Sequence, residues 1–336
     1  MNLKINFKKL LRLIEQAKEK RIYLAINQEK YKGKKIIFKM LDIQKIISEY
    51  PDMDFELSCT KEYRDMVNYC LDLLELSDID LDWNKIYYQL KNLKFRVKKI
   101  KHAQGEYHIR NNIISLSKGF ETDISTVFHE LLHAISSIVI DEIVICGFEY
   151  ENGITAIGSG LNEGYTSILT SRFAGEDSSY CILQNLVQKL EIILMPKVMQ
   201  KLYFDSNLNG LIQEISKYYN EPGEITTFLC DLDYIRNMDP KNCYEEIKNR
   251  IFRVETFLIK LMAKRSRINP FNDAELDTLD SLLIQKVKYK GHTFEFMDEE
   301  ERDNLIAGEL EKDLEYNEPI KTNIKLIFIA EKLPRR

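Results

Sequence analysis

The segment His129-Glu130-Leu131-Leu132-His133 places two histidines four residues apart and a glutamate directly after the first of them. In a helix, residues i and i+4 lie on one face, so both imidazoles can reach the same Zn²⁺ ion. A bound zinc lowers the pKa of a coordinated water, and Glu130 is placed to accept the proton that this water loses. With 5 His in 336 residues, chance placement produces this pattern roughly 0.01 times per chain. The spacing therefore indicates a metal site.

The residues around this segment divide into a polar and an apolar side when they are placed on a helix at about 100° per residue. The histidines are flanked by Ser125, Thr126, Ser136 and Ser137. The opposite side is apolar and consists of Ile124, Val127, Phe128, Leu131, Leu132, Ile135 and Ile138. Thr122 or Asp123 can cap this helix, which we expect to end near Val139. A core helix with two incidental histidines does not require such a division, so the pattern favours a metal site.

A catalytic zinc ion that binds two imidazoles and a water needs one further protein ligand. Glu163 is our candidate, because Asn162 can cap a second helix over about 163–173 and Glu163 then lies in its first turn. Four acids between the two helices are rivals, namely Asp141, Glu142, Glu149 and Glu151. We expect residues 141–160 to form a loop with one strand at about 154–157. Zinc is the expected metal, although Mn²⁺ or Co²⁺ suits the same ligands.

HELLH followed by NEG on a second helix resembles the gluzincin group of zinc metallopeptidases, over roughly residues 109–173. In that group, two histidines and a glutamate on a downstream helix bind zinc, and the glutamate of HExxH is the general base. The resemblance therefore implies that His129, His133 and Glu163 bind zinc. It also implies that Glu130 is the general base.

The resemblance also bears on the surroundings of the site. In this peptidase group, an edge strand beside the active helix pairs with extended substrate through backbone hydrogen bonds. The expected strand IISLS at 113–117 can fill this role, and it can equally be an ordinary sheet strand. A Tyr or His usually stabilises the oxyanion, and Tyr165, Tyr180 and His292 are open candidates. Many members orient a metal-bound His with an Asp where this chain has Ser167, so that partner must come from elsewhere.

The composition predicts a folded, helix-rich globular protein. Hydrophobic residues make up 44% of the chain, and its 13 Gly and 7 Pro are few for 336 residues, which favours long helices. The six cysteines form no CxxC pair and no Cys/His cluster, so we expect reduced, mostly buried thiols and no disulfide framework. The N-terminus lacks the apolar core of a signal peptide, and no apolar run is long enough to span a bilayer. We therefore expect a cytoplasmic protein.

The charge pattern gives little support to a nucleic-acid partner, because the net charge of the chain is −5. Residues 85–101 hold seven Lys or Arg and no acid, with interspersed aromatic residues, which is compatible with a nucleic-acid face. A charged protein surface is the favoured interpretation. The chain has no GxGxxG or Walker sequence, so no nucleotide cofactor is expected.

The distribution of patterns predicts a helix-rich α+β fold that contains a zincin-like metallopeptidase core with a small mixed sheet. We expect an N-terminal helical and mixed region at 1–93, the catalytic core at 94–175 and a mainly helical region at 176–336. Helical patterns dominate from 180 to 288, with breaks near Pro196, Pro222, Pro240 and Pro270.

The expected active-site cleft lies between the sheet-bearing part and the helical part. IISLS and the helices that carry His129 and Glu163 line it. His129, Glu130 and His133 face the cleft, whereas four apolar residues of the same helix are buried. These four are Ile124, Leu131, Ile135 and Ile138.

The sequence predicts a zinc-dependent metallopeptidase that hydrolyses bonds of a peptide or protein substrate with a metal-activated water. The alternative is a non-catalytic interaction or regulatory protein that retains a zincin-like fold and a metal site. Glu130 distinguishes the two, because hydrolysis needs a general base and zinc binding alone does not. Its presence favours the enzyme.

Overall fold

The computed structural model describes residues 60–308 except for short gaps. The gaps are residues 78, 80, 91–92, 102, 121–122, 141, 153–155, 176–179, 284–285, 299, 303 and 306–307. Most of the predicted N-terminal region, residues 1–59, therefore lies outside the described residues. The described part is helix-rich and contains small sheets, which agrees with the predicted α+β class.

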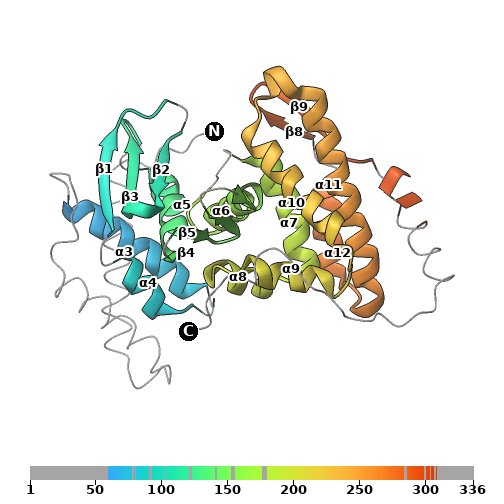
Figure 1. Cartoon of the computed structure of the whole chain (residues 1–336), viewed down its shortest axis with the longest axis horizontal. Coiled ribbons are helices and arrows are strands. Elements are labelled where there is room, and N and C mark those ends of the chain that lie inside the picture. The colour runs from blue at the N-terminus through green and yellow to red at the C-terminus, as the bar shows by residue number, and fades with distance from the viewer. Residues whose placement is uncertain are drawn as a thin grey trace. The chain divides into compact units, whose positions relative to one another are not determined.

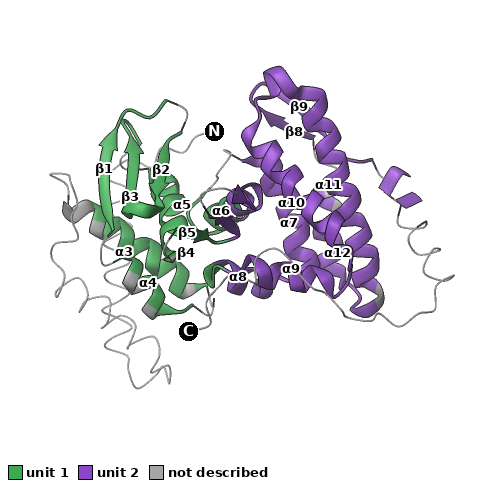
Figure 2. Ribbon diagram, in the orientation of Figure 1, with its two compact units in different colours: residues 1–147, 166–178, 204–206 green, residues 148–165, 179–203, 207–336 purple. Residues whose placement is uncertain are grey.

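The described residues form two compact units (Figure 2). The first contains the described residues of 1–147, 166–178 and 204–206, and the second contains those of 148–165, 179–203 and 207–336. Helix α6 (Ser159–Phe173) contributes residues to both, because the boundary falls within this continuous helix. The described helices before residue 93 belong to the same unit as the sheet that follows them.

The first unit contains a three-stranded mixed sheet (Figure 1). Its strands are β1 (Lys94–Lys98), β2 (Gly105–His108) and β3 (Ile113–Ser117), in the order β1-β3-β2. A short 3-10 turn, Ile109–Asn111, joins β2 to β3. β3 pairs parallel with β1 and antiparallel with β2, so IISLS is the central strand. Of the two alternatives for IISLS, the structure supports the ordinary sheet strand and excludes the edge strand of this sheet.

Two helices of the first unit precede this sheet, α3 (Thr60–Leu76) and α4 (Trp83–Leu90). Both helices, together with β2 and β3, contact the helix that carries HELLH. Tyr63 of α3 stacks on Phe95 of β1 with ring centroids 4.8 Å apart. The side chains of Phe95, Ile114 and Leu116 point into the core and are fully buried.

The HELLH helix, α5 (Ile124–Ile135), is buried at every residue except Ser125. Asp123 caps it, as predicted. Its carboxylate accepts hydrogen bonds from the backbone amide of Ser125 at 3.4 Å and from the hydroxyl of Thr126 at 2.8 Å. The predicted burial of Ile124, Leu131 and Ile135 is confirmed.

Helix α5 ends at Ile135, so its predicted extension to Val139 is wrong. Residues Ser137–Ile140 form strand β4, which pairs antiparallel with β5 (Ile143–Cys146). The hydroxyl of Ser137 donates to the carbonyl oxygen of Ala134 at 2.9 Å and helps to end the helix. Ile138 consequently lies on a strand and is half-buried, not buried as predicted.

The second unit is mostly helical. It begins with the hairpin of β6 (Glu149–Glu151) and β7 (Ala156–Ile157), so the predicted loop at 141–160 contains more strand than expected. The helices that follow α6 are α7 (Cys181–Leu194), α8 (Pro196–Phe204), α9 (Leu208–Ser216), α10 (Pro222–Asn237), α11 (Pro240–Ile268) and α12 (Asp273–Leu283). The chain then forms the hairpin of β8 (Lys286–Tyr289) and β9 (His292–Glu295).

The predicted breaks at three prolines are confirmed, because Pro196, Pro222 and Pro240 each begin a helix. Proline suits the first position of a helix, where its missing N–H has no intrahelical partner to lose. The fourth, Pro270, lies in the short connection between α11 and α12.

Helices α10 and α11 pack closely within the second unit. Phe228 stacks on Phe257 with ring centroids 4.6 Å apart. Asp231 of α10 is 1% exposed, and its carboxylate accepts hydrogen bonds from Arg250 at 2.7 Å and from Arg253 at 2.6 Å. The pairing satisfies a buried charge and fixes the rotation of α10.

The start of α6 is held by a residue of α10 that is distant in sequence. The Asp233 carboxylate accepts hydrogen bonds from the amides of Gly158 at 2.9 Å and Gly160 at 2.7 Å, and from the hydroxyl of Ser159 at 3.1 Å. The amide of Gly160 is one of the first-turn donors that a local cap would satisfy. Asn162, the predicted cap, instead lies inside the helix, where its side-chain oxygen accepts from the amide of Phe148.

Two further predictions concern cysteines and membranes. No disulfide joins the five cysteines that the structure describes, but only Cys70 and Cys146 are buried, so the prediction of mostly buried thiols is wrong. Among the described helices, none is both long and apolar enough to cross a membrane.

The close approach of α6 to α10 predicts a large difference between two glycine substitutions. A Cβ on Gly160 would lie 2.2 Å from the carbonyl oxygen of Leu232, whereas a Cβ on Gly223 of α10 would meet nothing within 4 Å. Gly160→Ala should lower the free energy of unfolding by about 1–3 kcal/mol. Gly223→Ala should leave it unchanged or raise it by up to about 1 kcal/mol. Denaturant titration measures both, and equal stability of the two variants would contradict this packing.

Candidate metal centre

The imidazoles of His129 and His133 converge on one point. Their Nε2 atoms are 3.2 Å apart, and the ring centroids are 4.9 Å apart at an interplanar angle of 71°. Two histidine nitrogens at 2.0–2.1 Å from a tetrahedral zinc ion are separated by about 3.3 Å. The pair therefore already has the separation that shared metal coordination requires.

Glu163 completes a group of three possible ligands. One ligand atom from each of His129, His133 and Glu163 lies within 4.8 Å of the other two. The three residues are 8%, 7% and 7% exposed, so the group is buried. Buried ionisable side chains are rare unless they are paired or bind a metal. Two imidazoles and a carboxylate form a donor set that suits Zn²⁺, and this group can hold a metal ion.

Helix α6 positions Glu163. Its C-terminal half belongs to the same unit as α5, and Phe173 there contacts Phe128 of α5 edge-on with ring centroids 6.3 Å apart. Because α6 begins at Ser159, Glu163 lies in the second turn and not in the first turn as predicted. Glu163 thus lies within a continuous helix whose C-terminal end packs against α5.

Arg236 of α10 holds the Glu163 carboxylate. Its Nη2 atom donates to Glu163 Oε1 at 2.8 Å. Burial alone would lower the pKa of Arg236, but the charge of Glu163 outweighs it, and the pKa lies above its ordinary value. A carboxylate has several acceptor positions, so Glu163 can bind a metal while Arg236 restrains it. Asp233 and Arg236 lie one turn apart on α10, and together they fix both the start of α6 and the side chain of Glu163.

Glu130 lies beside the first residue of β2. A Cβ on Gly105 would be 2.8 Å from Glu130 Cγ, 2.9 Å from Glu130 Oε1 and 2.9 Å from Thr126 Cγ2. Glycine at this position therefore leaves room for the Glu130 side chain, which is 7% exposed. No sequence signal identified Gly105, because its role depends on the packing of a strand against a helix.

Cys146 contacts His133 on the side of the imidazole that carries Nδ1. Its Sγ atom is 3.6 Å from His133 Nδ1 and 3.4 Å from the carbonyl oxygen of the same residue. No sequence pattern predicted this contact, since Cys146 approaches α5 only when β5 pairs with β4.

The three rival acids that the structure describes do not join the group. Glu142 is exposed, while Glu149 and Glu151 lie on β6 and are half-buried. Within the described residues, the group that can hold a metal ion consists of the two histidines and Glu163. Asp141 lies outside the described residues.

The three candidates for oxyanion stabilisation differ in their surroundings. Tyr165 is fully buried, and its hydroxyl donates to Glu191 Oε1 at 3.0 Å, so it belongs to the core of the second unit. His292 of β9 packs against Tyr244 with ring centroids 5.4 Å apart. Tyr180 interacts electrostatically with Arg236, the residue that pairs with Glu163.

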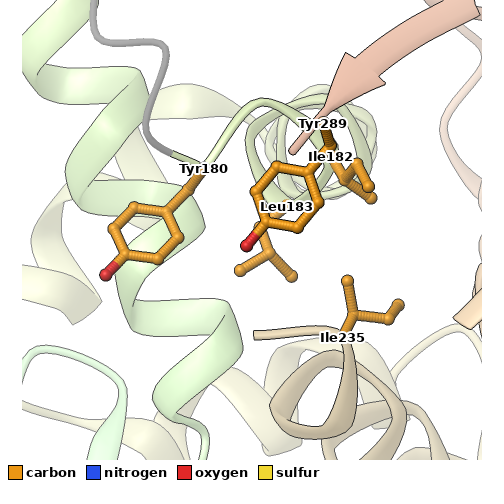
Figure 3. A pocket seen from close by; sticks show the side chains of 5 residues that line it. All are labelled: Tyr180, Ile182, Leu183, Ile235 and Tyr289. Carbon is orange, nitrogen blue, oxygen red and sulfur yellow. The ribbon is translucent and has the colours of Figure 1, made fainter. Parts of the chain in front are cut away.

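Tyr180 also lines a small hollow in the second unit, together with Ile182, Leu183, Ile235 and Tyr289 (Figure 3). The hollow measures about 150 Å³, open solvent included. Ligand pockets usually measure about 300–1,000 Å³, so this hollow does not identify a substrate.

Comparisons of the chain with protein-family models, with curated proteins and with solved structures find no match. The interpretation of the site rests on its residues and their geometry.

The geometry predicts that Glu163 contributes to metal affinity and that the exposed acid Glu142 does not. The wild-type chain should bind one equivalent of Zn²⁺. Glu163→Gln should weaken binding by more than the ~10–100-fold that loss of a hydrogen-bond partner of a ligand typically costs. Glu142→Gln should retain wild-type affinity. Competition with a chromogenic chelator measures all three, and equal affinity of the Glu163 variant would exclude this residue as a ligand.

Proposed function

We propose that this chain is a zinc-dependent metallopeptidase with a zincin-like catalytic core of the gluzincin type. The observation that carries the proposal is the convergence of His129 and His133, at 3.2 Å between Nε2 atoms, with Glu163 in the same buried group. Glu130 follows His129 directly and is not part of this group. A buried metal site with an adjacent carboxylate is the arrangement that metal-assisted hydrolysis requires.

The residues would act in distinct roles. His129, His133 and Glu163 would hold the ion, which when bound supplies a Lewis acid that activates water and polarises a carbonyl. Glu130 accepts a proton from the attacking water while the oxygen of this water bonds to the peptide carbonyl carbon. Glu130 then delivers this proton to the leaving nitrogen as the C–N bond breaks, which yields a carboxyl group and an amine. Arg236 keeps Glu163 in place throughout.

The sheet supports a position for an extended peptide substrate. β2 is an outer strand of the described three-stranded sheet, and its first residue, Gly105, adjoins Glu130. A peptide that adds to an outer strand gains backbone hydrogen bonds with little dependence on its sequence. We assign this role to β2 instead of the central strand β3.

Glu130→Gln tests the proposed chemistry. The amide cannot accept the proton, so hydrolysis of an unstructured peptide library should fall by about 10²–10⁴-fold. Zinc content and melting temperature should stay near the wild-type values, because Glu130 is not a ligand. Mass spectrometry of the peptide products and elemental analysis provide the measurements. A fully active variant would rule out Glu130 as the base, and an inactive wild type with bound zinc would favour the non-catalytic alternative.

Gly105→Ala tests the placement of Glu130. The added Cβ must displace the Glu130 side chain, and a shift of about 1 Å in a reacting group can cost about 10²-fold in rate. We expect kcat to fall by about 10–100-fold while zinc affinity is retained. Gly223→Ala is the matched control, since its Cβ meets no neighbour within 4 Å. Equal kcat values for the two variants would show that Gly105 does not constrain the base.

A further inference from the structure

A buried thiol makes two contacts with one metal-ligand candidate. Cys146 is the last residue of β5 and is 2% exposed. Its sulfur lies 3.6 Å from Nδ1 of His133 and 3.4 Å from the carbonyl oxygen of His133. The sulfur therefore touches both the side chain and the backbone of the same residue.

The two ring nitrogens of His133 face different partners. Nε2 lies 3.2 Å from Nε2 of His129, which belongs to the same group of possible metal ligands. Nδ1 faces the sulfur of Cys146. A neutral imidazole that binds a metal through one nitrogen carries its proton on the other, and the acceptor of that proton fixes the tautomer. A thiol can donate S–H to a carbonyl and accept a hydrogen bond at sulfur, so Cys146 can satisfy both groups.

We propose that Cys146 is the positioning residue of His133. Its sulfur accepts the Nδ1–H hydrogen bond, which holds the ring in the tautomer whose Nε2 lone pair points to the metal. This inference rests on the proposed metal site, and it does not depend on peptidase activity. Cys146 would thus give a candidate metal-binding histidine a hydrogen-bond partner, a role for which many gluzincins use an Asp at the position of Ser167.

The β4–β5 hairpin holds Cys146 in position. Ser137 and Cys146 are register partners in this hairpin. The amide of Gly147 donates to the carbonyl oxygen of Ser136 at 2.8 Å, directly after α5. The hydroxyl of Ser206 donates to the same carbonyl oxygen. The strand pairing and the Gly147 bond attach the end of β5 to the residues that directly follow α5, so the thiol is placed by backbone pairing.

Cys70 provides a matched control for the loss of a buried thiol. It lies on α3 in the same unit and is 0% exposed. Cys70→Ala and Cys146→Ala remove the same group from a buried position, so both should lower stability. Only the second removes the partner of His133. Cys146→Ser retains a donor and acceptor and serves as the conservative variant.

The experiment uses the full chain as wild type and as these three variants. Zn²⁺ affinity, measured with a chelator, should fall by about 10–100-fold for Cys146→Ala and less for Cys146→Ser. It should not change for Cys70→Ala. In metal-free protein, long-range ¹H–¹⁵N spectra of the 5 histidines should show His133 protonated at Nδ1 in wild type and a mixture of tautomers in Cys146→Ala.

The outcomes separate this inference from the proposed function. If wild type binds zinc and the two alanine variants match it in affinity and in the His133 tautomer, Cys146 is only a core thiol and the metal site stands. If wild type binds no zinc, the metal site and this inference both fall. If zinc binds as expected but no peptide is cleaved, only the peptidase proposal fails.

Discussion

Helix α5 is buried over nearly its whole length, so its polar side chains must find partners inside the protein. Thr126 bonds to Asp123 and to Gln104, and His133 contacts Cys146. The neighbouring strand must also leave space for Glu130, which is why β2 begins with glycine at the point of contact. A polar face that is buried in this way cannot be explained as a solvated surface. The need to satisfy this buried polar face therefore links α5 to β2, to the β4–β5 hairpin and to α6.

The second helix is positioned by charge as well as by packing. Asp233 serves the amides at the start of α6, and Arg236 pairs with Glu163 one turn further along the helix. The two residues of α10 act on different parts of α6, namely its first backbone amides and the side chain of Glu163. Burial raises the pKa of Asp233, and its three hydrogen bonds oppose that effect. Rigid support of this kind favours a site whose ligands are already in place before the ion binds.

The sequence predicted the features that depend on local pattern. Helical spacing placed His129 and His133 on one face, Asp123 was one of two candidate caps, and three prolines marked breaks between helices. The errors concern features that distant residues decide. Helix α5 ends early because β5 offers a partner for β4, and α6 begins early because Asp233 replaces a local cap. IISLS is the central strand because β1 and β2 pair with its two edges. Cys146 contacts His133 because β5 pairs with β4 in a hairpin. Spacing along the chain contains no information about such contacts.

The placement of Asp233 and Arg236 on α10 limits how far the site can be treated as a portable module. A fragment of residues 94–175 would include both histidines, Glu130 and Glu163. It would lack the carboxylate that serves the first amides of α6 and the guanidinium that restrains Glu163. Grafting the two motifs onto another scaffold would therefore transfer the ligands without the groups that orient them. Arg236 lies 73 residues beyond Glu163 in the chain, so the HELLH segment and the NEG helix together are only part of the chain on which this arrangement depends.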